Sequence, residues 1–264
     1  NLWIVWPYLP GGQEQAAATA PTAPQLKVVS ANLWYRNDSY DAGINYLLAS
    51  NADVIGLVEL TPQWLTALQP VFERYPYHVV VLERVPPVES MLLSKQPFTR
   101  SFAGRIDGRT PTIAWGEVAL AGRPVVVAET HLSWPLLPAI GNEHQTVAGS
   151  LQPEPLLGSD PLLQSPQAGT LAQYLAGLGP DVVLMGDFNG VPWSRTQAAF
   201  RAATGFTDDG PMVPTWPAWS RYWLRLPIDH ILVKGALDRI GFRRGLYVGS
   251  DHLPVEAEIA IKPQ

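Results

Sequence analysis

The chain has no cysteine, which excludes thiol catalysis, cysteine-bound zinc and disulfide bonds. It also has no excess of positive charge, because the formal net charge of its 264 residues is −5 at pH 7. The molecule as a whole is therefore not suited to non-specific binding of nucleic acid, although a local cationic site or a bound metal is compatible with this charge. A glycine-rich phosphate loop, a Gly-x-Ser-x-Gly elbow and a His-Glu-x-x-His pair are also missing, so nucleotide-binding and serine-hydrolase functions have no support.

The first apolar run, from Asn1 to Pro10, is shorter than the ~20 residues that a membrane-crossing helix needs. Its tryptophans and tyrosine are typical of a membrane–water boundary. It is either a stub of a membrane anchor that precedes residue 1 or an apolar arm packed on the domain. Residues 11–24 are rich in Gly, Gln, Ala, Thr and Pro and are expected to form a linker. The composition, 47% hydrophobic and 16% charged, predicts one large α/β domain over residues 25–264.

Apolar runs predict strands that first alternate with helices and later follow one another. Strands are expected over residues 26–33, 52–60, 77–83, 90–95, 112–120, 124–132, 181–188, 227–234 and 253–261. Helices are expected over residues 39–51, 167–178 and 194–203, the last capped by Ser194, and from Pro62 onward after the cap Thr61. The alternation at the start predicts a parallel pair of strands. Residues 134–166 have no clear periodicity and are expected to be a lid, a partner surface, a mobile segment or a cover of the core.

The stretch from Asp181 to Gly190 is the most informative one. Four apolar residues with consecutive valines predict a buried strand, and Gly186 lets the backbone turn out of the sheet. Asp187 and Asn189 follow on either side of Phe188, so we expect both polar side chains to point into the same cleft. A carboxylate beside an amide suits a metal ion or an oxyanion, although a polar turn after a strand is the alternative for so short a motif.

Similar polar residues recur near the ends of the other predicted strands. The set comprises Asn32, Glu59, His131, Asp187, Asn189, Asp229 with His230, and Asp251 with His252. Each one alone is typical of a turn. Because the carboxyl ends of strands are where loops build sites on a rigid scaffold, the set predicts one shared functional site.

The combination of these motifs resembles the metal-dependent endonuclease/exonuclease/phosphatase superfamily, which includes deoxyribonuclease I. The motifs, in the family's order, are Ser-Ala-Asn32, Val-Glu59, Thr-His131-Leu, Gly-Asp187-Phe-Asn189, Ile-Asp229-His230 and Gly-Ser-Asp251-His252-Leu-Pro. The resemblance covers residues 25–262 and is strongest for the bacterial branch whose catalytic domain follows membrane helices. It implies an α/β (α+β) fold: a four-layer α/β sandwich of two packed mixed β-sheets flanked by helices.

The resemblance also implies roles for the individual residues. Glu59 is the expected main ligand of a Mg²⁺ or Mn²⁺ ion, and Asp251 is a further candidate ligand. The chemistry agrees, because a hard cation held by one or two carboxylates takes other ligands from water and phosphate. Asp229 and His252 are the expected carboxylate–imidazole pair that handles a proton.

The remaining members are expected to act on the phosphoryl group. Asn32, Asn189 and His131 would donate to its non-bridging oxygens. Asp187 would orient the attacking water or protonate the leaving group, and either Asp187 or His252 is the general base. Glu89 is weighed as a partner of His131, with a solvated surface carboxylate as the favoured alternative.

The expected function is hydrolysis of phosphoesters, with nucleic acid as the first substrate class. The alternatives are a phosphatase or a phospholipid- or sphingomyelin-type phosphodiesterase acting on a lipid or small phosphoester, and a non-catalytic binding domain on the same scaffold. The branch implies membrane anchoring with the catalytic domain outside the cytoplasm.

Several other residues allow more than one interpretation. Arg105 and Arg109 lie before a strand and could reach phosphate or simply be solvated, and His230 is expected to pack in a wall. One aromatic run could stack on bases or a ring, while packing under the loop before Asp229 is favoured. It contains Trp216, Trp219, Tyr222 and Trp223.

Overall fold

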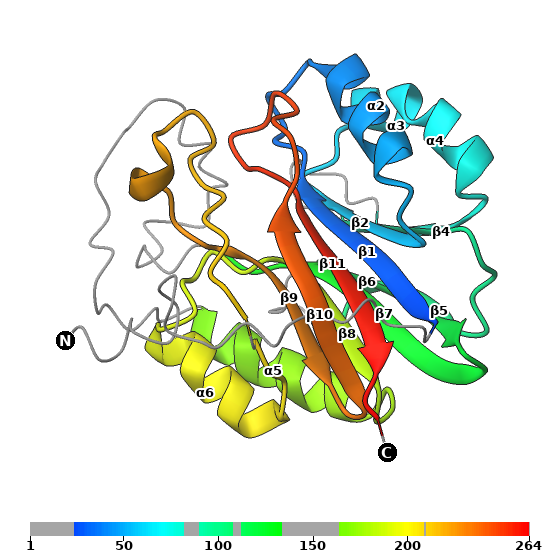
Figure 1. Ribbon diagram of the computed structural model, residues 1–264, viewed down its shortest axis with the longest axis vertical. Coiled ribbons are helices and arrows are strands. Elements are labelled where there is room, and N and C mark those ends of the chain that lie inside the picture. Colours follow the sequence, from blue (N-terminus) through cyan, green and yellow to red (C-terminus); the bar gives the residue numbers. More distant parts are fainter. Residues whose placement is uncertain (1–23, 82–89, 108–111, 134–163, 209, 264) are drawn as a thin grey trace.

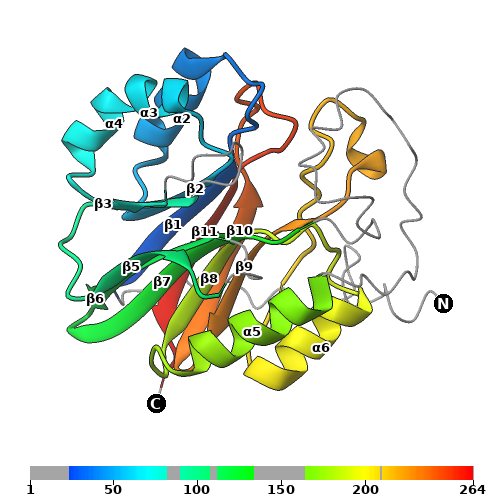
Figure 2. The same ribbon diagram turned by 180° about the vertical axis from the view of Figure 1, so that it is seen from behind.

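The computed structural model describes residues 24–81, 90–107, 112–133, 164–208 and 210–263. Two mixed β-sheets pack face to face, and helices cover the outer face of each (Figures 1 and 2). The predicted fold class, a four-layer α/β sandwich of two mixed sheets, is therefore confirmed. Within the described residues, no helix is both long enough and apolar enough to cross a membrane.

The first sheet has six strands, and β1 and β2 at its centre are parallel, as the sequence predicts. Its other neighbouring strands pair antiparallel. In spatial order the strands are β10 (Leu237–Arg244), β11 (Val255–Ile261), β1 (Gln25–Asn32), β2 (Val54–Val58), β4 (Ser90–Ser94) and β3 (Tyr77–Val80).

The second sheet has five strands and again one parallel pair, formed by β7 and β8. Ala121 and Gly122 make the turn between β6 and β7, both with positive φ (52° and 80°), and β7 already begins at Arg123. In spatial order the strands are β5 (Ser101–Arg105), β6 (Thr112–Leu120), β7 (Arg123–His131), β8 (Val182–Asp187) and β9 (Asp229–Lys234).

Helices α2 (Tyr40–Ser50), α3 (Pro62–Ala67) and α4 (Gln69–Arg74) lie on the first sheet, and α5 (Gln164–Ala176) and α6 (Arg195–Thr204) lie on the second (Figure 2). Both predicted caps are confirmed. The Thr61 hydroxyl accepts from the Trp64 amide, with Pro62 as the first helical residue, and the Ser194 hydroxyl accepts from the Gln197 amide. Helix α5 begins at Gln164, three residues earlier than expected.

Three apolar clusters fill the spaces between the four layers. The central one lies between the sheets and includes Val28, Val127 and Val183. A second, around Trp64 and Leu57, joins the first sheet to its helices, and a third, around Phe188 and Leu171, does the same for the second sheet. Strands β2 and β8 are buried along their whole lengths, which explains their continuous apolar runs.

Strands β5 and β10, which are both edge strands, were not predicted from the sequence. Strand β10 carries three arginines and a register shift between Arg239 and Gly241, and β5 is exposed at both ends. An edge strand is covered on fewer sides, so its sequence need not alternate between apolar and polar residues. The predicted stub and linker, Glu89, Arg109 and most of the 134–166 segment lie outside the described residues.

Candidate active site

Five of the eight predicted site residues stand at, or directly beside, the ends of strands that meet at one edge of the sandwich. Asn32, His131 and Asp187 are the last residues of β1, β7 and β8, and Glu59 follows β2. The carboxyl ends of the parallel pairs therefore meet here, as predicted. Asp229 departs from the prediction, because it begins β9 rather than ending a strand. Strand β9 runs antiparallel to β8 and pairs Asp229 with Asp187, so a strand start lies at the same edge.

His252 and Asp251 reach the site from a loop, in front of the first residue of β11, Val255. Strand β11 runs antiparallel to β1, so its start also lies beside Asn32. The Ser250 hydroxyl fixes this loop, donating to the Asn32 carbonyl at 2.7 Å and accepting from the His252 amide at 3.1 Å. The loop is thereby tied to the first sheet.

Asn32 holds two carboxylates together at the centre of the site. Its amide nitrogen donates to Glu59 Oε1 at 2.8 Å and to Asp187 Oδ2 at 3.1 Å, and its Oδ1 accepts from the Trp34 amide at 2.9 Å. The Tyr35 amide donates to the other Glu59 oxygen at 3.3 Å. Asn32 is therefore fully hydrogen-bonded inside the protein, and in this arrangement it reduces the repulsion between two acids.

Asn189 holds His131 in a similar way. Its amide nitrogen donates to the Leu132 carbonyl at 2.8 Å and lies 3.0 Å from His131 Nε2. Since an amide nitrogen only donates, His131 Nε2 is the acceptor and the ring is neutral, with its proton on Nδ1. His131 Nε2 also lies 3.7 Å from Asp187 and 4.0 Å from Glu59. The Asn189 Oδ1 is buried and has no hydrogen-bond partner within the described ranges.

His252 bridges two buried aspartates. Its Nδ1 lies 2.9 Å from Asp229 Oδ2 and its Nε2 lies 3.5 Å from Asp187 Oδ2. Burial opposes a positive charge on the ring, but the carboxylates of Asp229 and Asp187 outweigh it and raise the pKa of His252 to about 10. The two carboxylates therefore favour the imidazolium form of the ring.

Asp187 is itself perturbed by its surroundings. Burial raises the pKa of its carboxyl, and Asp229 adds to the shift while His252 opposes it. The backbone amide of Asn189 donates to Asp187 Oδ1 at 2.8 Å. A raised carboxyl pKa is typical of a group that carries a proton in a reaction.

Asp251 lies beside this group and is held by Trp216, whose ring nitrogen donates to its Oδ2 at 3.3 Å. Burial raises the pKa of the Asp251 carboxyl, with Glu59 adding to the shift and His252 opposing it. Its Oδ1 is buried without a hydrogen-bond partner among the residues that the structure describes.

Backbone strain concentrates at this edge. Glu59, Asn189 and Trp34 have φ angles of 57°, 45° and 57°, in the left-handed region that residues other than glycine rarely adopt. Such a conformation costs on the order of 1 kcal/mol or more and persists only where surrounding contacts impose it. Here those contacts hold a metal-ligand candidate and an amide beside Asp187 and His131.

The donor set fits a hard divalent cation. Two groups bring their ligand atoms within 4.8 Å of one another: Glu59 with His131 and Asp187, and Asp187 with Asp229 and His252. The first group offers carboxylate oxygens and a neutral imidazole, whereas the second already forms the His252 hydrogen bond. Asp251 belongs to neither group, but its unpartnered buried oxygen is open to a ligand.

A buried acid supports the site from below. Glu129, on β7, is fully buried and accepts from the Ser30 hydroxyl on β1 at 2.8 Å, which connects the two sheets. Burial raises the pKa of its carboxyl well above the usual value. Gly56 makes room for it, because a Cβ at Gly56 would lie 2.0 Å from Glu129 Oε2.

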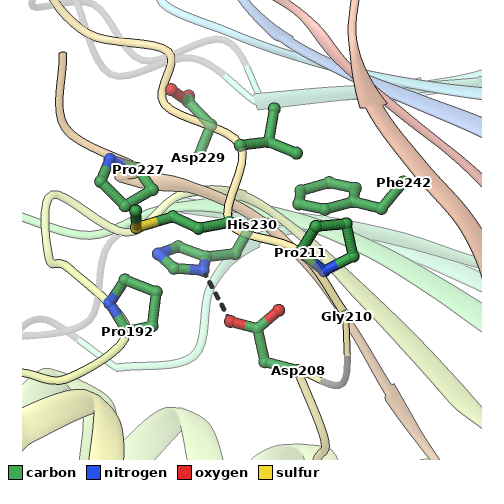
Figure 3. Close-up of a pocket in the computed structure, with 10 residues that line it drawn as sticks. Pro192, Asp208, Gly210, Pro211, Pro227, Asp229, His230 and Phe242 are labelled. Atoms are coloured by element: carbon green, nitrogen blue, oxygen red, sulfur yellow. Dashed lines mark ion pairs between the residues drawn. The ribbon is translucent and has the colours of Figure 1, made fainter. Parts of the chain in front are cut away.

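His230 faces away from Asp229 and packs in a wall, as expected (Figure 3). Its Nε2 lies 2.8 Å from the Gly190 carbonyl and its Nδ1 lies 3.4 Å from Asp208 Oδ2. Arg239 donates to Asp208 Oδ1 at 2.8 Å. Burial would raise the pKa of Asp208, but the hydrogen bond with His230 and the Arg239 charge lower it below its usual value. His230 therefore links Asp208 to the loop that carries Asn189.

The residues that position the site were not predicted from the sequence. Thr215 donates its hydroxyl to Asp229 Oδ2, and Trp216, Ser30, Asp208 and Glu129 were not assigned these contacts. Thr215 precedes Trp216 in the aromatic run, which is the only local signal. Their partners lie far away in the sequence, so no spacing rule finds them.

One preference about the aromatic run is wrong. Trp216 is half-buried beside His252, but Trp219, Tyr222 and Trp223 are 62%, 47% and 69% exposed rather than packed under the loop. Arg105 is an exposed end of the edge strand β5.

Residues 29–252 match the sequence profile of the Endonuclease/Exonuclease/phosphatase family, and the chain belongs to this family. No curated protein matches the sequence. Among solved structures, an endonuclease/exonuclease/phosphatase from Bacteroides vulgatus is similar with a TM-score of 0.69 at 14% identity, covering 90% of this chain and 99% of that one.

Two further solved structures share the fold. TDP2 from D. rerio, in complex with a single strand DNA product, has a TM-score of 0.64 at 14% identity, covering 89% of this chain and 98% of that one. Sphingomyelinase C from Streptomyces griseocarneus has a TM-score of 0.61 at 19% identity, covering 89% and 99%. The fold is deoxyribonuclease I-like, and the chain carries the phosphoester-hydrolase scaffold of its family with a carboxylate–histidine cluster able to hold a metal ion.

Proposed function

We propose that the protein is a phosphodiesterase that depends on Mg²⁺ or Mn²⁺ and cleaves its substrate by in-line attack of water on phosphorus. The observation that carries the proposal is the convergence of Glu59, His131, Asp187, Asp229 and His252 within direct contact distances at one sheet edge. A binding-only scaffold does not need a His–Asp pair beside a metal-binding acid.

In this proposal Glu59 would hold the cation, with Asp187, His131 and Asp251 beside it. When bound, the ion supplies Lewis-acid stabilisation of the charge that develops on the phosphoryl group and the leaving oxygen. Asn32 keeps Glu59 and Asp187 turned toward each other. His131, oriented by Asn189, contributes a neutral ring at the edge of the phosphate position.

Proton transfer would be handled by His252 at Nε2 and by Asp187 opposite it. Asp229 accepts from His252 Nδ1, which fixes the ring orientation and stabilises its cationic form, and Thr215 holds Asp229 in turn. The protonated ring can donate to a leaving oxygen, and the neutral ring can accept a proton from the attacking water. The charge state of His252 in the protein with metal and substrate bound decides which of these two roles the ring takes.

Two substrate classes fit this chemistry. Nucleic acid is the class that the family resemblance favours. A phosphoester carried on a lipid is favoured by a specific observation. The loop between β10 and β11, which contains Asp251, also carries the exposed apolar side chains of Leu246 and Tyr247. Membrane anchoring outside the cytoplasm remains a prediction from the sequence.

A substrate panel tests the proposal. Bis-p-nitrophenyl phosphate, plasmid DNA, a single-stranded oligonucleotide and phospholipid vesicles would each be incubated with Mg²⁺, with Mn²⁺ and with EDTA. We expect hydrolysis that EDTA abolishes and that added metal restores. Complete inactivity on every phosphodiester, with folded protein and saturating metal, would instead favour the binding-domain alternative.

A further inference from the structure

The exposed large apolar side chains are concentrated on two loops. Within the described residues, all but one of those residues lie in the segment before β9 or in the loop between β10 and β11. These six are here called the aromatic rim: Trp219, Tyr222, Trp223, Leu224, Leu246 and Tyr247. The exception is Tyr77 on β3. Soluble proteins rarely expose such groups together without an interaction to explain them.

The aromatic rim is continuous with the candidate active site. Trp219 lies 6.3 Å from Trp34, ring centre to ring centre, and the Trp34 amide bonds to Asn32. The Ala218 amide donates to the Asp251 carbonyl at 2.7 Å. The turn η2 (Tyr222–Leu224) and the β10–β11 loop both lie at the end of the sheets where β1 and β10 finish (Figure 1). Whatever the aromatic rim contacts is therefore held next to the site.

Charge is segregated on the same two segments. Residues 210–228 and 239–250 contain no acidic residue and carry five arginines, in a chain whose net charge is −5. Arg239 and Arg243 form ion pairs with Asp208 and Glu256, so Arg221, Arg225 and Arg244 supply the positive charge beside the exposed rings. The Arg221 guanidinium lies 5.9 Å from the centre of the Trp223 ring, and that of Arg244 lies 4.9 Å from the centre of the Tyr222 ring. The surface thus combines apolar tips with positive charge, which is complementary to an anionic partner.

We propose that the aromatic rim docks the protein on an anionic lipid bilayer and presents the active site to phosphoester headgroups. Trp, Tyr and Leu beside Arg are the composition that binds the boundary between headgroups and acyl chains. A single strand of nucleic acid fits less well. Leu224 and Leu246 offer bases no ring to stack on, and a guanidinium already lies over one face of Tyr222 and of Trp223.

Docking on the bilayer does not depend on the proposed function, whereas the cleavage of phosphoester headgroups rests on it. Binding is therefore measured without turnover, with EDTA present. The full chain would be sedimented with phosphatidylcholine vesicles, with and without phosphatidylglycerol. We expect co-sedimentation that anionic lipid strengthens and added salt weakens. Failure to hydrolyse lipid in a protein that binds vesicles would count against the substrate but not against docking.

Substitutions locate the contact. Trp223→Ser with Leu224→Ser, and Leu246→Ser with Tyr247→Ser, should each lower vesicle affinity by about tenfold or more, because they remove apolar area from the bilayer contact. The matched control Tyr77→Ser should bind as the unchanged protein does. Arg221→Gln with Arg244→Gln should remove the preference for anionic lipid. All should retain metal-dependent hydrolysis of soluble bis-p-nitrophenyl phosphate.

Three results would overturn the proposal. One is equal vesicle binding by the rim variants and the unchanged protein. Another is no vesicle binding at all, with the rim variants losing affinity for a single-stranded oligonucleotide instead. The last is a change from dimer to monomer in sedimentation velocity on substituting the aromatic rim, which would identify a second copy of the chain as its occupant. Thermal unfolding of each variant checks that these exposed positions leave the fold intact.

Discussion

His252 and Asp229 form a buried hydrogen bond of 2.9 Å between Nδ1 and Oδ2 at the centre of the site. The bond joins the loop before β11 in the first sheet to the first residue of β9 in the second, so the two sheets must be packed for the pair to exist. It leaves Nε2 directed toward Asp187, 3.5 Å away. The proton-handling group is thus assembled by the fold rather than by local sequence.

Replacing His252 with alanine should lower turnover by roughly 10²–10⁴, the usual contribution of a positioned acid or base. The reason is that the variant loses the one ring that contacts both Asp187 and Asp229. The measurement is kcat on bis-p-nitrophenyl phosphate at saturating Mg²⁺. His78→Ala is the matched control, because this exposed histidine stacks on Phe72, on the helical side of the first sheet. Undiminished turnover in His252→Ala would remove the ring from the mechanism.

Metal binding should release protons at pH 8. Without a cation the pKa of His252 is raised to about 10, so the ring is protonated at this pH. A divalent ion among the carboxylates disfavours the imidazolium, lowers its pKa and expels the proton. Calorimetric titration of Mg²⁺ or Mn²⁺ in two buffers of different ionisation enthalpy measures the release. His252→Asn should reduce it, and an identical release in that variant would assign the proton to another group, such as Asp187.

Much of the fold could be predicted because its central strands are buried on both faces. Val54–Val58 and Val182–Asp187 have no exposed residue, so their apolar runs are unmistakable, and the polar residues that follow them stand out. Edge strands such as Leu237–Arg244 gave no such pattern. Their pairing is decided by neighbours in space, which the local sequence does not record.

The site was predictable in membership but not in its hydrogen bonds. The side chains of Asn32 and Asn189, which are expected to donate to phosphate, bond to Glu59, Asp187 and His131 within the protein. Sequence motifs identify residue types at strand ends, whereas the partner of each donor depends on how two sheets converge. The same limit applies to the aromatic run, because its composition alone does not show whether its side chains are buried or exposed.

Glu59→Gln should raise the metal concentration needed for half-maximal activity by at least about tenfold, comparable to the loss of an outer partner of a metal ligand. Glutamine keeps an oxygen for Asn32 but removes the negative charge that attracts the cation. Mg²⁺ and Mn²⁺ activation curves measure the shift. Glu73→Gln, an exposed change on α4, should leave both curves unmoved. If Glu59→Gln also leaves them unmoved, Glu59 is not the main ligand.

Glu129→Gln should stabilise the protein more as the pH rises. Burial raises the pKa of Glu129 in the folded state, so folding favours its protonated form. The stability that this group contributes is fully present below its unfolded pKa and is lost as the pH rises toward the folded pKa. Glutamine keeps the shape and an acceptor for Ser30 but does not ionise. The melting temperature of Glu129→Gln minus that of the unchanged protein should therefore increase between about pH 4.5, near the usual glutamate pKa, and about pH 8.

A second variant separates this charge effect from packing. Glu129→Ala should lower the melting temperature at every pH, because it leaves a cavity between the sheets and an unpaired Ser30 hydroxyl. If the difference between Glu129→Gln and the unchanged protein instead stays constant over this pH range, the carboxylate is ionised in the folded protein and a cation or a protein donor must compensate it. Repeating the melts with Mg²⁺ and with EDTA distinguishes these two sources, since only a bound ion would make the difference depend on metal.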